Sequence, residues 1–170
     1  MAKSKFEVWS MSNRQPWVEA VVRGYIHAKT RSDIFIPKGA IVFLHASKSL
    51  WSGWKELEWT SRLDMKTIPR GVVYAVARAK DIGDTGRVMP EGDRKYFRMS
   101  SGQYVANWMS ILFEDVIELP PVACNGTEQP TRKLREPLKD AILNYPPYKE
   151  ALKTLMLDQF DDYLLTLDVA

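Results

Sequence analysis

The sequence contains few of the residues that build disulfide frameworks and metal centres. Among its 170 residues are one cysteine, Cys124, and two histidines, His27 and His45. A lone cysteine excludes an intramolecular disulfide and a cysteine-rich zinc site. Two histidines without such a cluster also argue against a metal centre. We therefore expect neither a metal nor another cofactor.

Long hydrophobic runs are absent as well. Runs such as those at residues 34–36 and 40–44 are far shorter than the roughly 20 apolar residues that cross a bilayer. The first ten residues, MAKSKFEVWS, lack the apolar core of a secretory signal. The sequence also has no phosphate-binding loop or dinucleotide fingerprint. These observations predict a cytoplasmic protein that does not bind membranes.

Charge is distributed unevenly along an otherwise ordinary globular composition, which is 45% hydrophobic and 26% charged. The net charge is only +3, yet residues 1–55 carry nine Lys and Arg against three acids. If these basic side chains share one face, that face attracts phosphates. The alternative is a solvated surface whose charges happen to be uneven.

Residue periodicity predicts an α+β domain. Alternating patterns indicate about six strands, at 6–11, 27–36, 40–46, 72–79, 95–99 and 103–119. Helical spacing indicates helices at 15–23, 48–63, 132–143 and 148–167, the last clearly amphipathic. Residues 81–93, rich in Gly, Asp and Pro, predict a long loop. Short strands with inserted helices favour a small β-barrel with a C-terminal amphipathic helix.

Several pieces of the sequence, in order, resemble the ASCH domain, a family of PUA-like β-barrels. They are residues 10–17 (SMSNRQPW), 21–24 (VVRG) with Arg31, 38–48 (KGAIVFLHASK), 69–78 (PRGVVYAVAR) and 113–120 (FEDVIELP). The resemblance covers roughly residues 6–125. It implies a barrel domain at 1–125, to which a helical extension at 126–170 is added.

The resemblance implies a cleft that accepts RNA or a nucleobase, between the helix that starts at Gln15 and the strands that carry Arg31 and His45. The residues expected to bind nucleic acid are Gln15, Trp17, Arg31, His45, Ser47 and Lys48. A guanidinium forks onto phosphate, and a tryptophan stacks on a base.

Each of these residues also has a purely structural interpretation. Trp17 is equally suited to core packing, and Ser47 to capping a helix. Arg31 suits an ion pair with Asp33 or Glu19, and a buried His45 needs only one hydrogen-bond partner.

Some small bacterial members of the family hydrolyse acetylated cytidine and carry a lysine two residues after the glycine that corresponds to Gly24. Here that position is Ile26, which cannot act as a base. The remaining catalytic candidates are Lys29, His27 and Glu114, with His45 as a further proton carrier. We therefore expect a nucleic-acid or nucleobase-binding module, for RNA rather than duplex DNA. The alternative is a hydrolase of a modified nucleoside, or a ribonuclease.

A third possibility is a protein-interaction adaptor. If residues 48–63 are helical, Trp51 and Trp59 share one face with Lys55. Either that face or the C-terminal amphipathic helix then serves as the docking surface for a protein partner.

Overall fold

The computed structural model describes residues 6–31, 34–97 and 108–168. Its centre is a five-stranded mixed sheet in the order β1-β3-β4-β5-β2. The strands are β1 (Val8–Gln15), β2 (Ala28–Arg31), β3 (Ile41–Leu50), β4 (Val72–Asp84) and β5 (Met109–Ala123). β1 runs parallel to β3, and the remaining neighbours are antiparallel.

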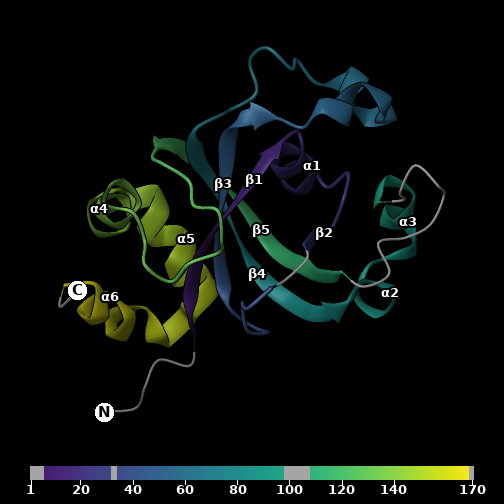
Figure 1. The fold of residues 1–170 in the computed structure, drawn as a ribbon. Coiled ribbons are helices and arrows are strands. Elements are labelled where there is room, and N and C mark those ends of the chain that lie inside the picture. Colours follow the sequence, from purple (N-terminus) through teal and green to yellow (C-terminus); the bar gives the residue numbers. More distant parts are fainter. Residues whose placement is uncertain (1–5, 32–33, 98–107, 169–170) are drawn as a thin grey trace.

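The sheet is strongly curved, but it is not a closed barrel of six strands as predicted (Figure 1). β4 and β5 are 13 and 15 residues long, and three register shifts interrupt their pairing. Such bulges increase the twist and bend the sheet. The expected strand at 95–99 begins instead as a 3₁₀ helix, η3 (Lys95–Phe97), and its remainder lies outside the described residues. The start of the segment 103–119 also lies outside them.

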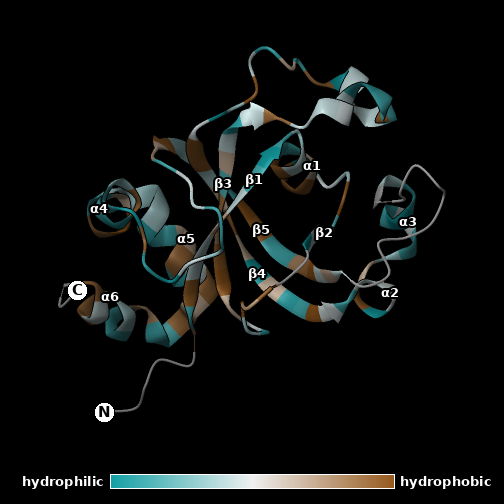
Figure 2. Ribbon diagram, viewed as in Figure 1, coloured by the Kyte–Doolittle hydropathy of each residue, from teal (hydrophilic) through white to brown (hydrophobic). Residues whose placement is uncertain are grey.

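The two faces of the sheet bury separate hydrophobic clusters. Alternation along β3 sends Val42 and Leu44 to an inner cluster, and Ile41 and Phe43 to an outer one. The inner cluster includes residues of α1 (Trp17–Arg23) and η2 (Glu58–Arg62), whereas η1 (Ser52–Glu56), which precedes η2, has no buried residue. The outer face is covered by α4 (Glu136–Asn144), α5 (Pro146–Met156) and α6 (Phe160–Asp168), as Figures 1 and 2 show.

Several predicted element boundaries are wrong for identifiable reasons. Residues 48–63 do not form one helix: β3 continues to Leu50, and η1 and η2 follow. The predicted C-terminal helix is interrupted at Leu157, whose φ of 55° is left-handed. The 81–93 loop is instead the end of β4 followed by α2 (Thr85–Val88) and α3 (Glu91–Arg94).

Two prolines lie within β5 and do not end it. Pro120 and Pro121 fall in the register shift between the pairs Ala75↔Glu118 and Val73↔Val122. Proline is tolerated at a bulge because no ladder hydrogen bond is lost there. The strand therefore continues to Ala123, and this brings the segment after it close to the end of β3.

No helix in the described ranges is long and apolar enough to cross a membrane.

Candidate functional site

The first feature of the site is a lysine beside a tryptophan. The Lys29 Nζ on β2 lies 4.5 Å from the ring centroid of Trp17, the first residue of α1. Burial lowers the pKa of the Lys29 ammonium to about 7, and the positive charge of Arg31 adds to the effect. At neutral pH much of this amine is therefore uncharged and able to accept a proton.

Trp17 belongs to an aromatic cluster that begins in the core and reaches the surface. Its ring centroid lies 5.1 Å from that of Trp51 and 6.1 Å from that of Trp59, on which Tyr25 stacks at 5.5 Å. Trp17 and Trp59 are buried, whereas Trp51 and Tyr25 are half-buried. On the predicted face that carries Trp51 and Trp59, the Trp51 ring is therefore partly exposed, whereas the Trp59 ring belongs to the inner cluster.

Gln15 is fully buried and holds the start of α1. Its side-chain nitrogen donates to the Pro69 carbonyl at 2.7 Å and to the Tyr74 hydroxyl at 3.0 Å. Its side-chain oxygen accepts from the Glu19 backbone N–H at 3.0 Å, and the Tyr74 hydroxyl donates to the Glu19 carboxylate at 2.6 Å. The Gln15 amide therefore has partners on both sides within the protein.

His45 points away from the inner cluster and binds the segment that follows β5. Its Nε2–H donates to the Cys124 carbonyl at 2.9 Å, so its Nδ1 accepts from the Ser12 hydroxyl at 3.0 Å. The Thr127 N–H donates to the same hydroxyl oxygen at 3.1 Å. Burial lowers the pKa of His45, which favours this neutral form.

Arg31 lies between the two edges of the curved sheet. From β2 its guanidinium donates to the Ser12 carbonyl on β1 at 3.2 Å, and to the Glu128 carbonyl at 2.8 Å. Of the two ion-pair partners expected for Arg31, Glu19 pairs with Arg23 instead, at 2.8 Å, and Asp33 lies outside the described residues. Arg31, Ser12 and His45 therefore together hold residues 124–128 against the sheet.

The other catalytic candidates lie at separate positions. His27 precedes β2, and its ring lies 3.3 Å from the Asp93 carboxylate, which also accepts the Ala28 backbone N–H at 2.9 Å. Glu114 is on β5, paired in register with Arg78 on β4. Within the described ranges, no three metal-binding side chains are grouped to hold an ion.

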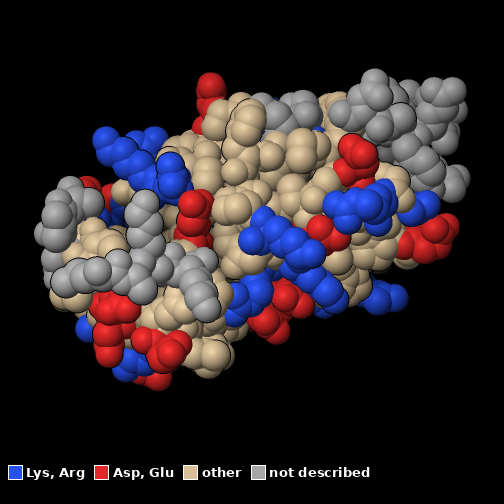
Figure 3. All heavy atoms as spheres, turned by 90° about the horizontal axis from the view of Figure 1, so that it is seen from below, with Lys and Arg blue, Asp and Glu red and all other residues tan. Residues whose placement is uncertain are grey.

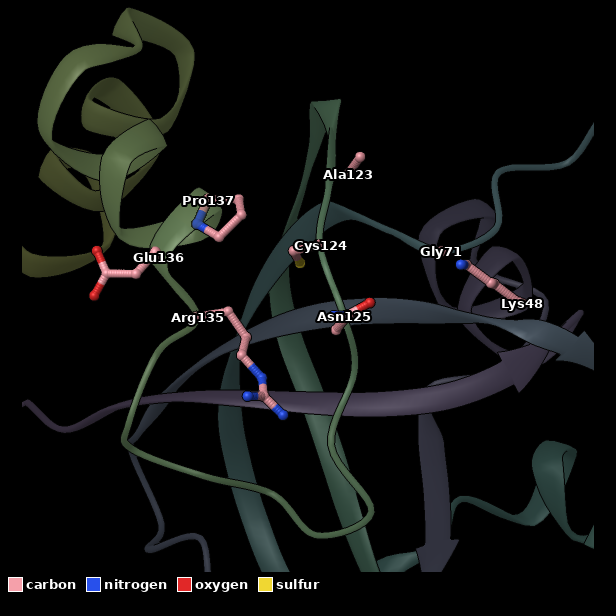
Figure 4. Close-up of a pocket in the computed structure, with 8 residues that line it drawn as sticks. All are labelled: Lys48, Gly71, Ala123, Cys124, Asn125, Arg135, Glu136 and Pro137. Carbon is pink, nitrogen blue, oxygen red and sulfur yellow. The ribbon is translucent and has the colours of Figure 1, made fainter.

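A pocket of about 350 Å³ opens where the ends of β3 and β5 meet the first turn of α4. Figure 4 shows Lys48 and Arg135 on opposite sides of it, with Cys124 and Asn125 between them. Of this set, the sequence predicted only Lys48 as a binding residue. Arg135 is 87 positions further along the chain, and no local pattern indicates that the two come together.

On the side seen in Figure 3, Lys and Arg lie beside Asp and Glu and form no single basic patch. Arg23, for example, bonds both Glu19 and Glu118. Ser47 also differs from its predicted capping role: it lies within β3 and donates to the Ser49 carbonyl at 3.3 Å.

A scan against protein-family models finds no match, and a search of the curated proteins finds no relative. Solved structures do match. The ASCH protein of Zymomonas mobilis is 16% identical, with a TM-score of 0.52 over 81% of this chain and 95% of that one. A variant of that protein with one tyrosine replaced by phenylalanine gives 16% identity and a TM-score of 0.51, over 82% and 98%. The resemblance seen in the sequence is confirmed at the level of the fold: the chain has the fold of an ASCH domain.

Proposed function

We propose that the protein is a nucleic-acid-binding module for single-stranded RNA rather than duplex DNA. The observation that carries this proposal is the half-buried Trp51 ring packed on Trp17, with the Lys29 ammonium 4.5 Å from the Trp17 ring. An unpaired base stacks on such a ring, whereas bases within a duplex are not accessible to it. The choice of RNA follows from the ASCH resemblance.

Lys29 suits a site where a base stacks, because the protonation of its amine changes when the ligand binds. With a pKa of about 7, the amine gains a proton when a phosphate approaches, since the anion stabilises the charged form. Binding is therefore expected to take up protons and to weaken as the pH rises from 7 to 9.

The test is a fluorescence-anisotropy titration with a labelled single-stranded RNA and a labelled duplex DNA, each at 50 and 200 mM salt. We expect the RNA to bind with an affinity that falls steeply with salt. Trp51→Ala should weaken binding about tenfold, a typical loss for one stacked base. Phe35→Ala is the matched control, because Phe35 is 73% exposed and contributes to neither hydrophobic cluster. Equal binding of the duplex, or an unaffected Trp51→Ala variant, contradicts the proposal.

One observation favours a second function, hydrolysis of a modified nucleoside. Lys29 combines a lowered pKa with a position beside Trp17, which suits a general base next to a base-binding ring. Release of acid from an acylated nucleoside by the wild type, and its loss in Lys29→Met, would support an enzyme. A panel of acylated nucleosides and RNA that yields no product removes this function.

A further inference from the structure

We propose that the pocket between the sheet and α4 is a phosphomonoester site, which binds the terminal phosphate of an RNA strand or of a free mononucleotide. This inference rests on the proposed function for the strand and identifies the chemical group that the protein recognises at its end. The pocket is lined by Lys48, Gly71, Ala123, Cys124, Asn125, Arg135, Glu136 and Pro137.

The charges around the pocket favour a dianion. Lys48 and Arg135 enter from opposite sides, and Arg70 lies beside Lys48, donating to its carbonyl at 3.4 Å. Within the part of the chain that the structure describes, no carboxylate forms an ion pair with any of these three side chains. The one acid in the lining, Glu136, turns its carboxylate away from the pocket in Figure 4. An arginine fork and a lysine ammonium together match the charge and oxygens of a phosphate.

The backbone holds Lys48 in place across the pocket wall. Gly71 has a φ of 67°, and a Cβ added there would lie 3.1 Å from the Lys48 Cγ and 3.2 Å from its Cε. The aliphatic chain of Lys48 therefore crosses Gly71 at a distance that leaves little room for a side chain. The Gly71 N–H donates to the Ala46 carbonyl at 2.7 Å, which fixes the turn to the strand that carries Lys48.

The opposite wall is held by the His45 network. Gly126 packs so closely on Ser12 and His45 that an added Cβ would lie 2.5 Å from the Ser12 Oγ. Arg135 donates to the Gly126 carbonyl at 3.3 Å, which ties the start of α4 to the same segment. The first turn of α4 adds the positive end of a nine-residue helix on the side of Arg135. The pocket thus requires both the sheet and the C-terminal helices.

The size and position of the pocket indicate one terminal nucleotide. A volume of about 350 Å³ is at the lower end of the range for small-ligand sites, about 300–1,000 Å³. Lys48 precedes Trp51 by three residues near the end of β3, a separation of at most about 10 Å along an extended chain. A strand whose end occupies the pocket can therefore place a neighbouring base at Trp51.

The experiment compares one short RNA carrying a 5′-phosphate, a 3′-phosphate or hydroxyl ends, together with 5′-AMP and adenosine. We expect one phosphorylated strand to bind at least fivefold more tightly than the hydroxyl strand, and 5′-AMP to bind more tightly than adenosine. Lys48→Ala and Arg135→Ala should each reduce these ratios to about one. Lys133→Ala is the matched control, since Lys133 is exposed in the same connector but does not line the pocket.

Cys124 provides a second readout that a purely structural effect would not reproduce. It is the only cysteine and lines the pocket, and burial raises the pKa of its thiol. Its reaction with a thiol reagent at pH 8 should be slowed severalfold by 5′-AMP but not by adenosine. Circular dichroism of each variant establishes that it is folded.

The outcomes separate this inference from the proposed function. If the hydroxyl and phosphorylated strands bind equally and 5′-AMP gives no protection, the pocket inference is overturned while RNA binding stands. If no strand binds but 5′-AMP binds and protects Cys124, the RNA function fails and the pocket is a mononucleotide site. If neither binds, both are overturned.

Discussion

Two sets of polar side chains surround the end of β3, and their environments are opposite. Gln15, Arg31 and His45, which belong to the ASCH-like motifs, are engaged by protein carbonyls, hydroxyls or amides. Lys48 and Arg135 face a pocket instead, and within the described residues neither has a carboxylate partner. Gln15, Arg31 and His45 therefore shape the frame, whereas the charge offered to a ligand comes from Lys48, the last residue of one motif, and from Arg135, which lies outside the motifs.

Breaking the frame at Gln15 should have the largest effect. Gln15→Ala leaves the Pro69 carbonyl, the Tyr74 hydroxyl and the Glu19 N–H without their present partner in a buried setting. We expect the free energy of unfolding to fall by about 3 kcal/mol, measured by urea denaturation. Arg14→Ala, an exposed neighbour, is the control and should change it by less than about 0.5 kcal/mol. Equal effects of the two changes would show that the Gln15 hydrogen bonds do not support the frame.

The fold was predictable where local patterns agree with tertiary packing. The strand at 40–46, the helix before Gly24 and the apolar stripes of residues 148–167 all follow simple periodicities. The failures are equally physical. Apolar residues spaced three apart, such as Trp51 and Trp54, suit a 3₁₀ helix as well as an α-helix, and a bulge lets β5 pass Pro120.

The candidate site was predictable only in part. Lys48 and Lys29 were named from the sequence, and the structure gives both a distinctive environment. The side chains of β3 alternate between its two faces. The His45 side chain therefore points to the face opposite that of Leu44, toward residues 124–127. Arg135 was missed because its position depends on how α4 packs on the sheet, which no spacing within the sequence reports.

Gly71 joins the frame to the pocket. Gly71→Ala places a side chain at a left-handed φ of 67° and against the Lys48 methylenes. We expect a loss of about 1–2 kcal/mol in the free energy of unfolding. The preference for a phosphorylated strand over a hydroxyl strand should fall as well, because the added side chain displaces Lys48. Gly92→Ala is the control, since an added Cβ there meets nothing within 4 Å. If Gly71→Ala lowers the stability but leaves the preference for a phosphorylated strand unchanged, Gly71 does not hold Lys48 in the pocket.

Lys29 should make the stability depend on pH above neutrality. Its pKa is lowered to about 7, so the unfolded chain binds the proton that the folded protein has lost, and stability rises from pH 7 to 9. One proton over two pH units corresponds to at most about 2.7 kcal/mol, and partial contact with water reduces this to about 1 kcal/mol. Lys29→Met should remove the rise in denaturation curves at the two pH values. If the stability of Lys29→Met rises equally from pH 7 to 9, other titrating groups cause the rise.

His45 should give the smallest effect, on the acidic side. Its pKa is lowered in the folded protein, so its contribution is complete above about pH 6.5 and is lost as the pH falls. Protonation of Nδ1 abolishes its acceptance of the Ser12 hydroxyl. We expect a loss of less than about 1 kcal/mol between pH 7 and 5.5, measured by thermal unfolding and reduced in His45→Gln. An equal loss in His45→Gln would assign the slope to other groups.

The most direct test of the central claim is an NMR titration of the ¹⁵N-labelled protein with a 5′-phosphorylated and a 3′-phosphorylated short RNA. The account predicts saturable shifts of the backbone amides of Lys48, Trp51, Gly71 and Asn125 with one of the two strands, while amides on the solvent face of α6 stay unchanged. Shifts absent from these four residues, or concentrated on α6 with either strand, would contradict the claim that the ligand-facing charge lies where the sheet meets α4.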